Sequence, residues 1–397
     1  MRTRSLPASR PLTLLVLAAA LTAAGPARAG ARTAGPVFTR VVQTGDPIPG
    51  GATDAFSSFG APATDGKSVS FYAKGSVREG IFTTATGALA VVAERTTLLP
   101  GTNVNFAFFG GPILENGVSL VSGLGAGGLH GVYLGDGGPL TVVADVFTPV
   151  PDGFGTFSDI GGFDAGGSSV VIQGRDSAGR PGIYRRRPDG TLALVANDTT
   201  PIPGGGNFEF LDLPAAAGKT VALRGGPLNQ GGLYAATRNG LTTIADTKTQ
   251  IPGGPGGTPF GFFEQTAAGG GTLAFIGGDA FFSYFGVFTY TGGTLGLVAD
   301  IFTPIPGGGG SVFSGFFAPG AGKGAVVFTG FGSLGEAGLW VSANGVIAPL
   351  LLAGDPLDGR TVSEVSFQAD GIEGRMIAVA VSFTDGSSGI YTATLPL

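Results

Sequence analysis

Several residue types that carry enzyme chemistry are scarce or absent in this sequence of 397 residues. It contains no cysteine, which excludes a disulfide framework, a thiolate nucleophile and any metal site with cysteine ligands. Because His130 is the single histidine, a site with several histidine ligands is excluded, and any Ser-His-Asp triad would depend on this one residue. Only 12% of the residues are charged and the formal net charge is −5, which disfavours a nucleic-acid partner.

Turn formers and apolar residues are abundant instead. The chain has 75 glycines, 27 prolines and 30 phenylalanines, and 43% of it is hydrophobic. A chain this apolar can bury a large core, so disorder is not expected despite the glycine content. Many turn formers and aromatic residues with little charge favour short strands and tight turns, and the sequence therefore predicts an all-β protein.

The first 29 residues have the layout of a secretory signal peptide. Arginines precede an apolar run from Leu12 to Ala24, which is too short to cross a bilayer, and Ala27-Arg28-Ala29 offers a small-x-small cleavage pattern. Residues 1–29 hold four arginines and no acid, so their removal changes the net charge from −5 to −9. We predict an exported protein without a membrane span in the mature chain, with residues 30–36 as a short linker and a destination that is extracellular or periplasmic.

A triplet of glycine, an aliphatic residue and an aromatic residue recurs seven times. The successive aromatic residues are 51, 51, 50, 54, 52 and 51 positions apart. The copies are Gly80-Ile81-Phe82, Gly131-Val132-Tyr133, Gly182-Ile183-Tyr184, Gly232-Leu233-Tyr234, Gly286-Val287-Phe288, Gly338-Leu339-Trp340 and Gly389-Ile390-Tyr391. A fixed period of this length is typical of repeat architectures such as propellers and solenoids.

Each unit of about 51 residues reads as four short strands: a Phe-rich stretch, an apolar run, the triplet and a second apolar run. Seven such units predict one domain over residues 37–397, a seven-bladed β-propeller of four-stranded antiparallel blades. The last unit ends after its third strand, whereas residues 37–42 resemble an isolated fourth strand. We therefore predict that the N-terminal strand completes the last blade and closes the ring, and that the chain is a monomer.

Two features of the repeat receive structural interpretations. The aromatic residues of the triplets and the Phe-rich strands are expected to pack between neighbouring blades, with an aromatic ligand platform as the alternative. The Thr-Pro-Ile-Pro-Gly-Gly loops at residues 200–205 and 303–308 are expected to be stiff crossovers between blades, since proline fixes φ and glycine permits the turn.

Acidic or amide residues close the fourth strand or follow it closely in all seven copies. They are Glu94, Asp145, Asn197, Asp246 and Asp300, with Asp46 and Asp355 in the shorter Gly-Asp-Pro loops. These residues could cap the turns that follow, as Asx residues do, or form a ring of oxygen ligands round one mouth of the channel for Ca²⁺ or a polyol. No Asp-x-Asp-x-Asp-Gly calcium loop is present, and we assign no cofactor, no metal ligand and no catalytic residue from the sequence.

The repeat resembles that of uncharacterised exported bacterial tandem-repeat proteins, whose unit combines Gly-Asp-Pro-x-Pro-Gly with Asn-x-x-Gly-x-x-Ala-Phe. Residues 45–50 and 354–359 match the first element. Gly271-Thr272-Leu273-Ala274-Phe275 matches part of the second, although Ala268 replaces its asparagine, and residues 324–328 match it more loosely. The resemblance implies a repeat fold and an extracellular setting, and it carries no activity.

Composition and architecture together favour a secreted, non-catalytic propeller. We expect it to bind or adhere to an extracellular glycan or protein through one face of the disc and the channel mouth. A third hypothesis is that the protein is a largely structural component of the cell surface. The alternative is an enzyme acting on extracellular glycans, a hydrolase or lyase with two carboxylates at the channel mouth. A pair of acids that breaks the repeat and points into the channel would favour that alternative.

Overall fold

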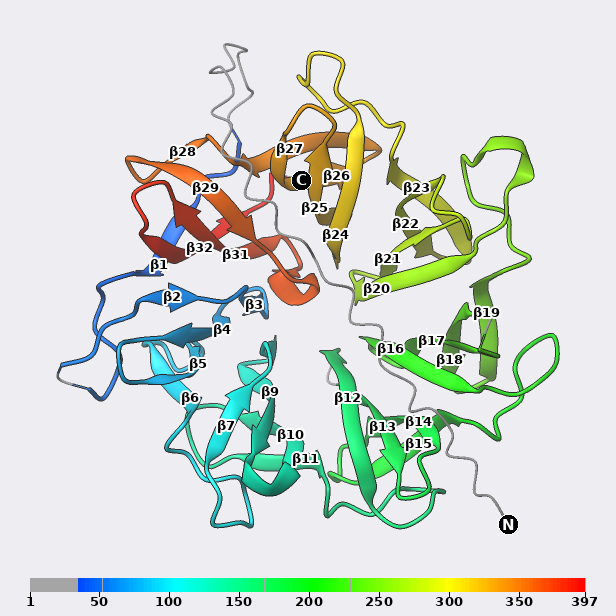
Figure 1. The fold of residues 1–397 in the computed structure, drawn as a ribbon, viewed down its shortest axis with the longest axis horizontal. Helices are drawn as coiled ribbons and strands as arrows, with labels where there is room; N and C mark the ends of the chain where they lie inside the picture. The colour runs from blue at the N-terminus through cyan, green and yellow to red at the C-terminus, as the bar shows by residue number, and fades with distance from the viewer. Residues whose placement is uncertain (1–34, 52, 168, 229, 397) are drawn as a thin grey trace, which may run out of the picture.

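The computed structural model describes residues 35–51, 53–167, 169–228 and 230–396, which form a ring of seven β-sheets around a central channel (Figure 1). Each sheet is one blade, and its main strands pair antiparallel in chain order from the centre to the rim. This confirms the predicted seven-bladed propeller. The predicted signal peptide, residues 1–29, lies outside the described residues. Nowhere in the described ranges is there a helix long and apolar enough to cross a membrane.

The inner strands of blades 1 and 2 are each divided in two. Blade 1 consists of β2 (Ser58–Phe59), β3 (Ala63–Thr64), β4 (Val69–Lys74), β5 (Glu79–Thr83) and β6 (Ala90–Glu94). Blade 2 consists of β7 (Phe106–Phe109), β8 (Ile113–Glu115), β9 (Val118–Gly125), β10 (His130–Gly135) and β11 (Thr141–Asp145). The interruptions coincide with Pro62 and Pro112.

Blades 3 to 6 have four unbroken strands each. Blade 3 holds β12 (Phe157–Gly166), β13 (Ser169–Asp176), β14 (Pro181–Arg186) and β15 (Leu192–Asn197). Blade 4 holds β16 (Phe210–Ala217), β17 (Thr220–Gly226), β18 (Gly232–Thr237) and β19 (Gly240–Asp246). Blade 5 holds β20 (Phe262–Gly269), β21 (Thr272–Gly278), β22 (Phe285–Thr291) and β23 (Thr294–Asp300). Blade 6 holds β24 (Phe313–Gly322), β25 (Ala325–Gly332), β26 (Ala337–Ala343) and β27 (Val346–Leu352).

Blade 7 joins the two ends of the chain. Its strands are β29 (Arg360–Ser366), β30 (Ile372–Glu373), β31 (Met376–Phe383), β32 (Ser388–Thr394) and β1 (Thr39–Gln43), with β28 (Pro356–Leu357) paired to β29. Three short 3-10 turns complete the inventory: η1 (Ala126–Gly128), η2 (Pro255–Gly257) and η3 (Ala369–Gly371). Strand β1 pairs antiparallel with β32, which places Thr39 opposite Thr392 and confirms the predicted closure by the N-terminal strand.

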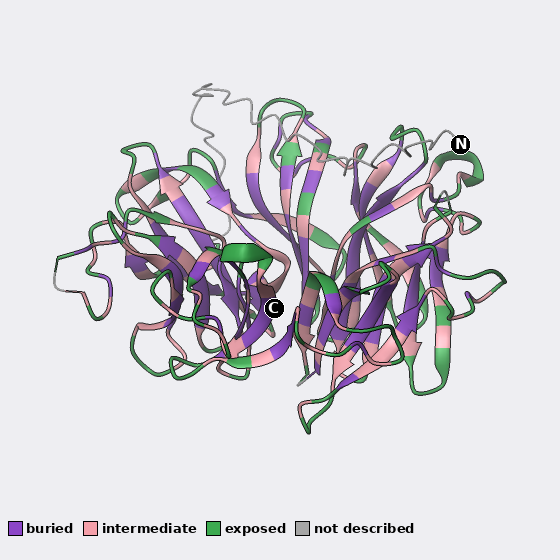
Figure 2. Cartoon of the chain, turned by 60° about the horizontal axis from the view of Figure 1, so that its bottom comes forward, coloured by how far each residue is buried: buried purple, intermediate pink, exposed green. Residues whose placement is uncertain are grey.

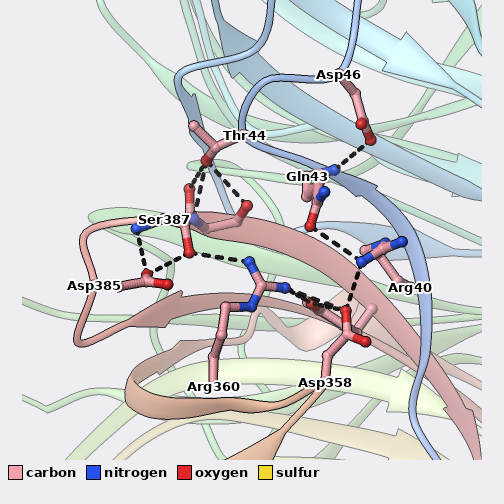
Figure 3. Close-up of polar contacts among 10 residues, drawn as sticks. Arg40, Gln43, Thr44, Asp46, Asp358, Arg360, Asp385 and Ser387 are labelled. Atoms are coloured by element: carbon pink, nitrogen blue, oxygen red, sulfur yellow. Dashed lines mark hydrogen bonds and ion pairs between the residues drawn. The ribbon is translucent and has the colours of Figure 1, made fainter.

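Polar side chains surround this closure (Figure 3). The Asp358 carboxylate accepts hydrogen bonds from Arg40 (2.7 Å) and Arg360 (3.2 Å), and Arg360 also donates to the Tyr391 hydroxyl at 2.6 Å. Arg40 and Asp358 are both exposed, so their ion pair contributes about 1 kcal/mol or less. The ladder between β1 and β32, together with the buried Val42 on β1, therefore accounts for most of the stability of the closure.

The recurring triplet lies on the third strand of every blade, and both of its side chains are buried. This strand is covered by neighbouring blades on both faces, so the aliphatic residue packs on one side and the aromatic residue on the other. A β-bulge in the outermost strand lies opposite each triplet. The glycine permits close approach there: a Cβ on Gly286 would lie 2.2 Å from the carbonyl oxygen of Ala299.

Aromatic pairs repeat between the triplets and the residues that begin the inner strands. In blade 3 the rings of Phe157 and Tyr184 are 5.1 Å apart and perpendicular, and in blade 5 Phe260 and Phe288 are 5.1 Å apart at 79°. Blades 1, 2, 4 and 6 have the same edge-to-face pair, which is the favourable arrangement for the ring quadrupoles. The predicted packing of these aromatic residues between blades is confirmed, as the buried strands in Figure 2 illustrate.

The Thr-Pro-Ile-Pro-Gly-Gly loops connect each outermost strand to the next blade. Each makes a short hairpin, such as the bridge between Pro304 and Val312, and inserts an aliphatic residue such as Ile305 into the core. Hydrogen bonds join these crossovers to the loops between the second and third strands, for example Ser333 N to Val312 O at 2.9 Å. The two sets of loops therefore share one face of the disc, which we call the crossover face.

Candidate functional site

The acidic and amide residues identified from the sequence cap turns at the rim of the disc. In blade 2, the Asp145 carboxylate accepts hydrogen bonds from the amide of Phe147 (3.0 Å) and the hydroxyl of Thr148 (2.7 Å). The same hydroxyl accepts a hydrogen bond from the amide of Asp145 at 3.0 Å. Equivalent contacts are made by Asn197, Asp246 and Asp300.

The remaining three members of the set differ from this pattern. Glu94 is engaged by Arg78, whose guanidinium nitrogen lies 2.7 Å from its carboxylate. In the other two copies the aspartate takes the place of the capping threonine, three residues after the last residue of the outermost strand. The Asp46 carboxylate accepts a hydrogen bond from the amide of Gln43 (2.9 Å), and the Asp355 carboxylate accepts one from the amide of Leu352 (2.8 Å). The sequence analysis did not distinguish caps formed by the residue that ends the strand from caps formed by the residue three positions later.

The position of these residues follows from the strand order. They follow the outermost strand of each blade, so they lie at the rim and not round the mouth of the channel, where a shared ligand would have to bind. Within the described ranges, no three His, Cys, Asp or Glu side chains are grouped so that they could hold a metal ion. The contacts observed are those of turn caps.

At the inner edge of the ring lies a segment of blade 7, residues 368–371, which we call the plug. It comprises Gln368 and the turn η3, and it contacts β3, β20 and β24 of other blades (Figure 1, short orange coil at the inner edge of the ring). The Gln368 amide donates to the carbonyl of Pro112 in blade 2 at 2.7 Å. The space left beside the plug is a cavity of about 20 Å³, about enough for one water molecule.

Two carboxyl groups meet at the plug. Asp164, on β12 of blade 3, lies close enough to Asp370 of η3 for the charge of Asp370 to raise its pKa, and Asp164 is only 8% exposed. The Asp164 carboxylate accepts the amides of Ala165 (2.7 Å) and Ala216 (2.6 Å).

The surroundings of this pair are acidic. Burial, together with the charges of Glu115 and Glu373, raises the pKa of Asp370 to about 6. Burial and the neighbouring charge of Asp370 raise the pKa of Asp164 well above its ordinary value. Burial and the charge of Glu115 also raise the pKa of Glu373. The pair therefore titrates as a unit, because each group feels the charge of the other.

Asp164 breaks the repeat. The residues that occupy its register position in blades 1, 2, 4, 5 and 6 are small or apolar: Ala63, Ile113, Ala215, Ala267 and Gly320. Sequence reasoning missed this pair, although comparing the repeats position by position would have singled out Asp164.

The space beside the two acids is small. The cavity beside them holds about 20 Å³, whereas ligand pockets usually hold at least roughly 300 Å³. A larger cavity of about 450 Å³ is lined by Val37, Thr392 and Pro396, among others, at the ends of the chain and away from the pair.

Large apolar side chains are exposed on the crossover face. Its loops carry the exposed phenylalanines Phe147, Phe154, Phe281, Phe282 and Phe302, together with Val77, Leu98, Leu228 and Leu334. Phe281 is 88% exposed and Phe302 is 61% exposed. Away from the crossover face, fewer large apolar side chains in the described residues are comparably exposed: Val346 at the start of β27, on the opposite face, is 67% exposed, and Val37, which precedes β1, is 84% exposed. The two faces therefore differ strongly in apolar character.

Comparison with known proteins places the chain in a family. The model of a family of unknown function, DUF7453, matches residues 15–165 and, a second time, residues 76–372. No curated protein matches the chain. Whether the motifs described above define the same family stays a prediction.

Solved structures show the same fold. The β-propeller domain of the Trilobed protease from Pyrococcus furiosus is similar, with a TM-score of 0.54 and 10% identity over 85% of this chain and 95% of that chain. A prolyl endopeptidase is similar with a TM-score of 0.50 and 14% identity, over 85% of this chain and 47% of that chain. The first of these has an open velcro topology, whereas here β1 pairs with β32. At these identities the likeness is one of fold alone.

Proposed function

The chain belongs to the DUF7453 family, whose function is unknown, and from the surface of its propeller we propose that it is an exported, non-catalytic binding module that docks a protein on its crossover face. The observation that carries this proposal is the asymmetry of exposed apolar side chains between the two faces. Exposed apolar groups gathered on one face mark interaction sites in soluble proteins. Export rests on the signal-peptide pattern of residues 1–29.

A protein partner fits this face better than a glycan does. Phenylalanine has no polar group, so sugar hydroxyls buried against it would lose hydrogen bonds to water without replacement. Aromatic side chains are instead enriched in the cores of protein interfaces, and the crossover face also carries Arg78 and Arg180. The exposed phenylalanines line neither of the two cavities described above, which suits a broad macromolecular surface more than a small ligand.

The absence of catalysis is part of the proposal. Asp164, the acid that breaks the repeat, is buried, and its neighbour Asp370 lines a cavity of only about 20 Å³. A glycan-active alternative would need both acids apart and open to substrate. The structural-component alternative would need self-association, which the same experiment detects.

The test uses the labelled mature chain, residues 30–397, and whole cells of the producing bacterium, with or without protease treatment of the cell surface or periodate oxidation of its glycans. We expect saturable binding that protease treatment abolishes and periodate leaves intact. The triple variant Phe154→Ser, Phe281→Ser, Phe302→Ser should weaken binding at least tenfold, since burying each phenylalanine contributes about 1.5–3 kcal/mol. Val346→Ser, which removes a side chain 67% exposed near the opposite face, is the matched control and should bind as the parent does.

Loss of binding after periodate alone would replace the protein partner with a glycan. Equal binding by the parent and the triple variant would refute docking on the crossover face. Sedimentation of the chain alone is the third arm, because concentration-dependent assembly that the triple substitution abolishes would assign this face to copies of the same chain.

A further inference from the structure

Three consecutive arginines break the repeat on the face of the disc opposite the crossover face. Arg185 and Arg186 end β14 of blade 3, and Arg187 begins the turn to β15. The three residues after the triplet aromatic residue include no cation in any other blade: they are residues 83–85, 134–136, 235–237, 289–291, 341–343 and 392–394. Six blades form the same strand without positive charge, so the blade itself does not require these arginines.

Two cations of the next blade lie beside them. Lys219 is in the turn between β16 and β17, and Arg238 is in the turn between β18 and β19. Because Val221 pairs with Ala236, Lys219 and Arg238 each lie two residues beyond this pair, at the same edge of blade 4. Arg185 joins the two blades, since its guanidinium donates to the carbonyl of Lys219 at 3.1 Å. Five cations thus occupy adjoining turns of blades 3 and 4 (Figure 1, green), and we call them the basic patch: Arg185, Arg186, Arg187, Lys219 and Arg238.

The charge of the basic patch is not balanced by the protein. Within the described ranges, no carboxylate forms an ion pair with any of its five cations, whereas on the crossover face Arg78, for example, pairs with Glu94. The three turns that carry the patch contain one acid, Asp189. Its carboxylate accepts the amide (2.9 Å) and the hydroxyl (2.7 Å) of Thr191 in its own turn, and it balances at most one of the five charges.

Two of the arginines are also short of suitable partners. The Arg185 guanidinium donates only to neutral oxygens, namely the Ser169 hydroxyl (2.7 Å) and the carbonyls of Gly218 and Lys219. Burial lowers the pKa of Arg185, because no anion offsets the loss of water around its charge. The Nε of Arg186 is buried and has no hydrogen-bond partner among the described residues. The other three side chains of the patch are exposed.

We propose that the basic patch binds the phosphate groups of a linear polyanion, whose chain lies across the adjoining turns of blades 3 and 4. Guanidinium groups donate to phosphate through paired N–H groups. The oxygens of a phosphate group point in several directions, so cations from two turns can share one group, whereas both oxygens of a carboxylate lie in one plane. A bound phosphate would supply the counter-charge that Arg185 lacks. This surface is separate from the crossover face and does not depend on the protein docking proposed there.

A narrow chain fits the charge distribution better than a broad anionic surface does. On the same face, the turns and strand ends of blades 1, 2 and 7 carry two cations and four acids: Lys67, Arg375, Asp65, Glu115, Asp136 and Glu373. A bilayer or a nucleic-acid duplex would meet these acids as well as the basic patch, and like charges repel. A flexible chain can contact the patch alone.

The probe for this site is short-chain inorganic polyphosphate with a terminal fluorophore, because it presents phosphate without sugar, base or lipid. Its binding to the mature chain, residues 30–397, is followed by fluorescence anisotropy at roughly 50 mM and 200 mM salt. We expect saturable binding that weakens as the salt concentration rises, since neutralised phosphates release their counterions. Absence of binding at the lower salt concentration would refute the proposal.

The decisive variant removes the exposed part of the patch. Arg187→Gln, Lys219→Gln and Arg238→Gln together delete three charges and leave the hydrogen bonds of Arg185 to backbone carbonyls and Ser169 in place. This variant should bind polyphosphate about tenfold or more weakly, since each exposed charge contact contributes up to a few-fold in affinity. Its affinity should also depend less steeply on salt.

The matched control removes three exposed charges elsewhere, through Lys67→Gln, Lys248→Gln and Lys323→Gln. It has the same net charge as the patch variant and should bind as the parent does. The triple phenylalanine variant of the crossover face should also retain polyphosphate binding, because the two surfaces lie on opposite faces. Thermal unfolding of the patch variant at the temperature of the parent shows that its fold is intact.

Three outcomes would overturn the proposal. Equal weakening in the patch variant and the lysine control would show that net charge alone governs binding. Equal affinity for polyglutamate of the same charge would remove the assignment to phosphate. Tighter binding to vesicles of anionic phospholipid than to polyphosphate, lost in the patch variant, would replace the linear polyanion with a membrane surface.

Discussion

The close approach of the outermost strand predicts that each triplet requires glycine at its first position, and Gly286→Ala is the clearest test of this. An added Cβ would lie 2.2 Å from the carbonyl oxygen of Ala299 and 3.0 Å from the Cα of Asp300, both backbone atoms of the adjacent strand β23. Neither can rotate away. Since β22 is bonded to β21 on its other side, relief requires β22 and β23 to separate at the bulge.

The cost can be estimated from these contacts. Overpacking costs about 1–3 kcal/mol, and the loss of one or two ladder hydrogen bonds adds about 1 kcal/mol each. We therefore expect Gly286→Ala to lower the free energy of unfolding by about 2–5 kcal/mol. The control is Gly315→Ala on β24, where the nearest atom to the new Cβ belongs to the Phe331 side chain at 3.6 Å, an ordinary contact. Its effect should stay within about 0.5 kcal/mol.

The assay is urea unfolding followed by the fluorescence of Trp340, the single tryptophan. This residue is fully buried in the cluster that also contains Ala299, so it reports the affected region directly. Gly286→Ala should lower the urea midpoint without a change in slope. Equal midpoints for the parent and Gly286→Ala would refute the close-approach argument, and so would an equal loss in Gly315→Ala.

Three further predictions concern closure, capping and acid stability. Val42→Asp places a charge in the buried contact of β1 with blade 7 and should destabilise the chain by about 3 kcal/mol or more in the same urea assay, whereas Val37→Asp, at an exposed position before β1, should have little effect. Thr303→Val removes the hydroxyl that both donates to Asp300 and accepts from its amide, and should cost about 1 kcal/mol; a stability unchanged from the parent would show that this cap is dispensable. The hydroxyl of Ser76 and three backbone amides hold the pKa of Asp54 well below its usual range, so its stabilising contribution is present above about pH 4 and is lost as the pH falls further. Thermal unfolding between pH 2 and pH 7 should show Asp54→Asn less stable than the parent at neutral pH and converging with it in acid, and a constant difference would contradict this.

Much of the fold could be predicted because its determinants are local and repeated seven times. The spacing of the triplets indicated the number of blades, and the unpaired strand at residues 37–42 indicated the closure with β32. The capping geometry of Asp145 was also within reach, because its partners Phe147 and Thr148 are two and three residues away. The placement of those caps at the rim was not, since it depends on which strand is outermost.

The site at the centre of the ring lay beyond sequence reasoning for the same physical reason. Asp164 and Asp370 belong to blades 3 and 7, and they meet because the ring is closed and the plug turns inward. The asymmetry of the faces depends on which loops share a side, and this follows from the antiparallel order of the strands. The sequence by itself thus determined the repeat, the blade and its core, because these arise from neighbours along the chain. Only the tertiary structure decided that an acid of blade 3 and an acid of blade 7 lie close together at the centre of the ring and that exposed phenylalanines gather on one face, because both depend on how separate blades are arranged.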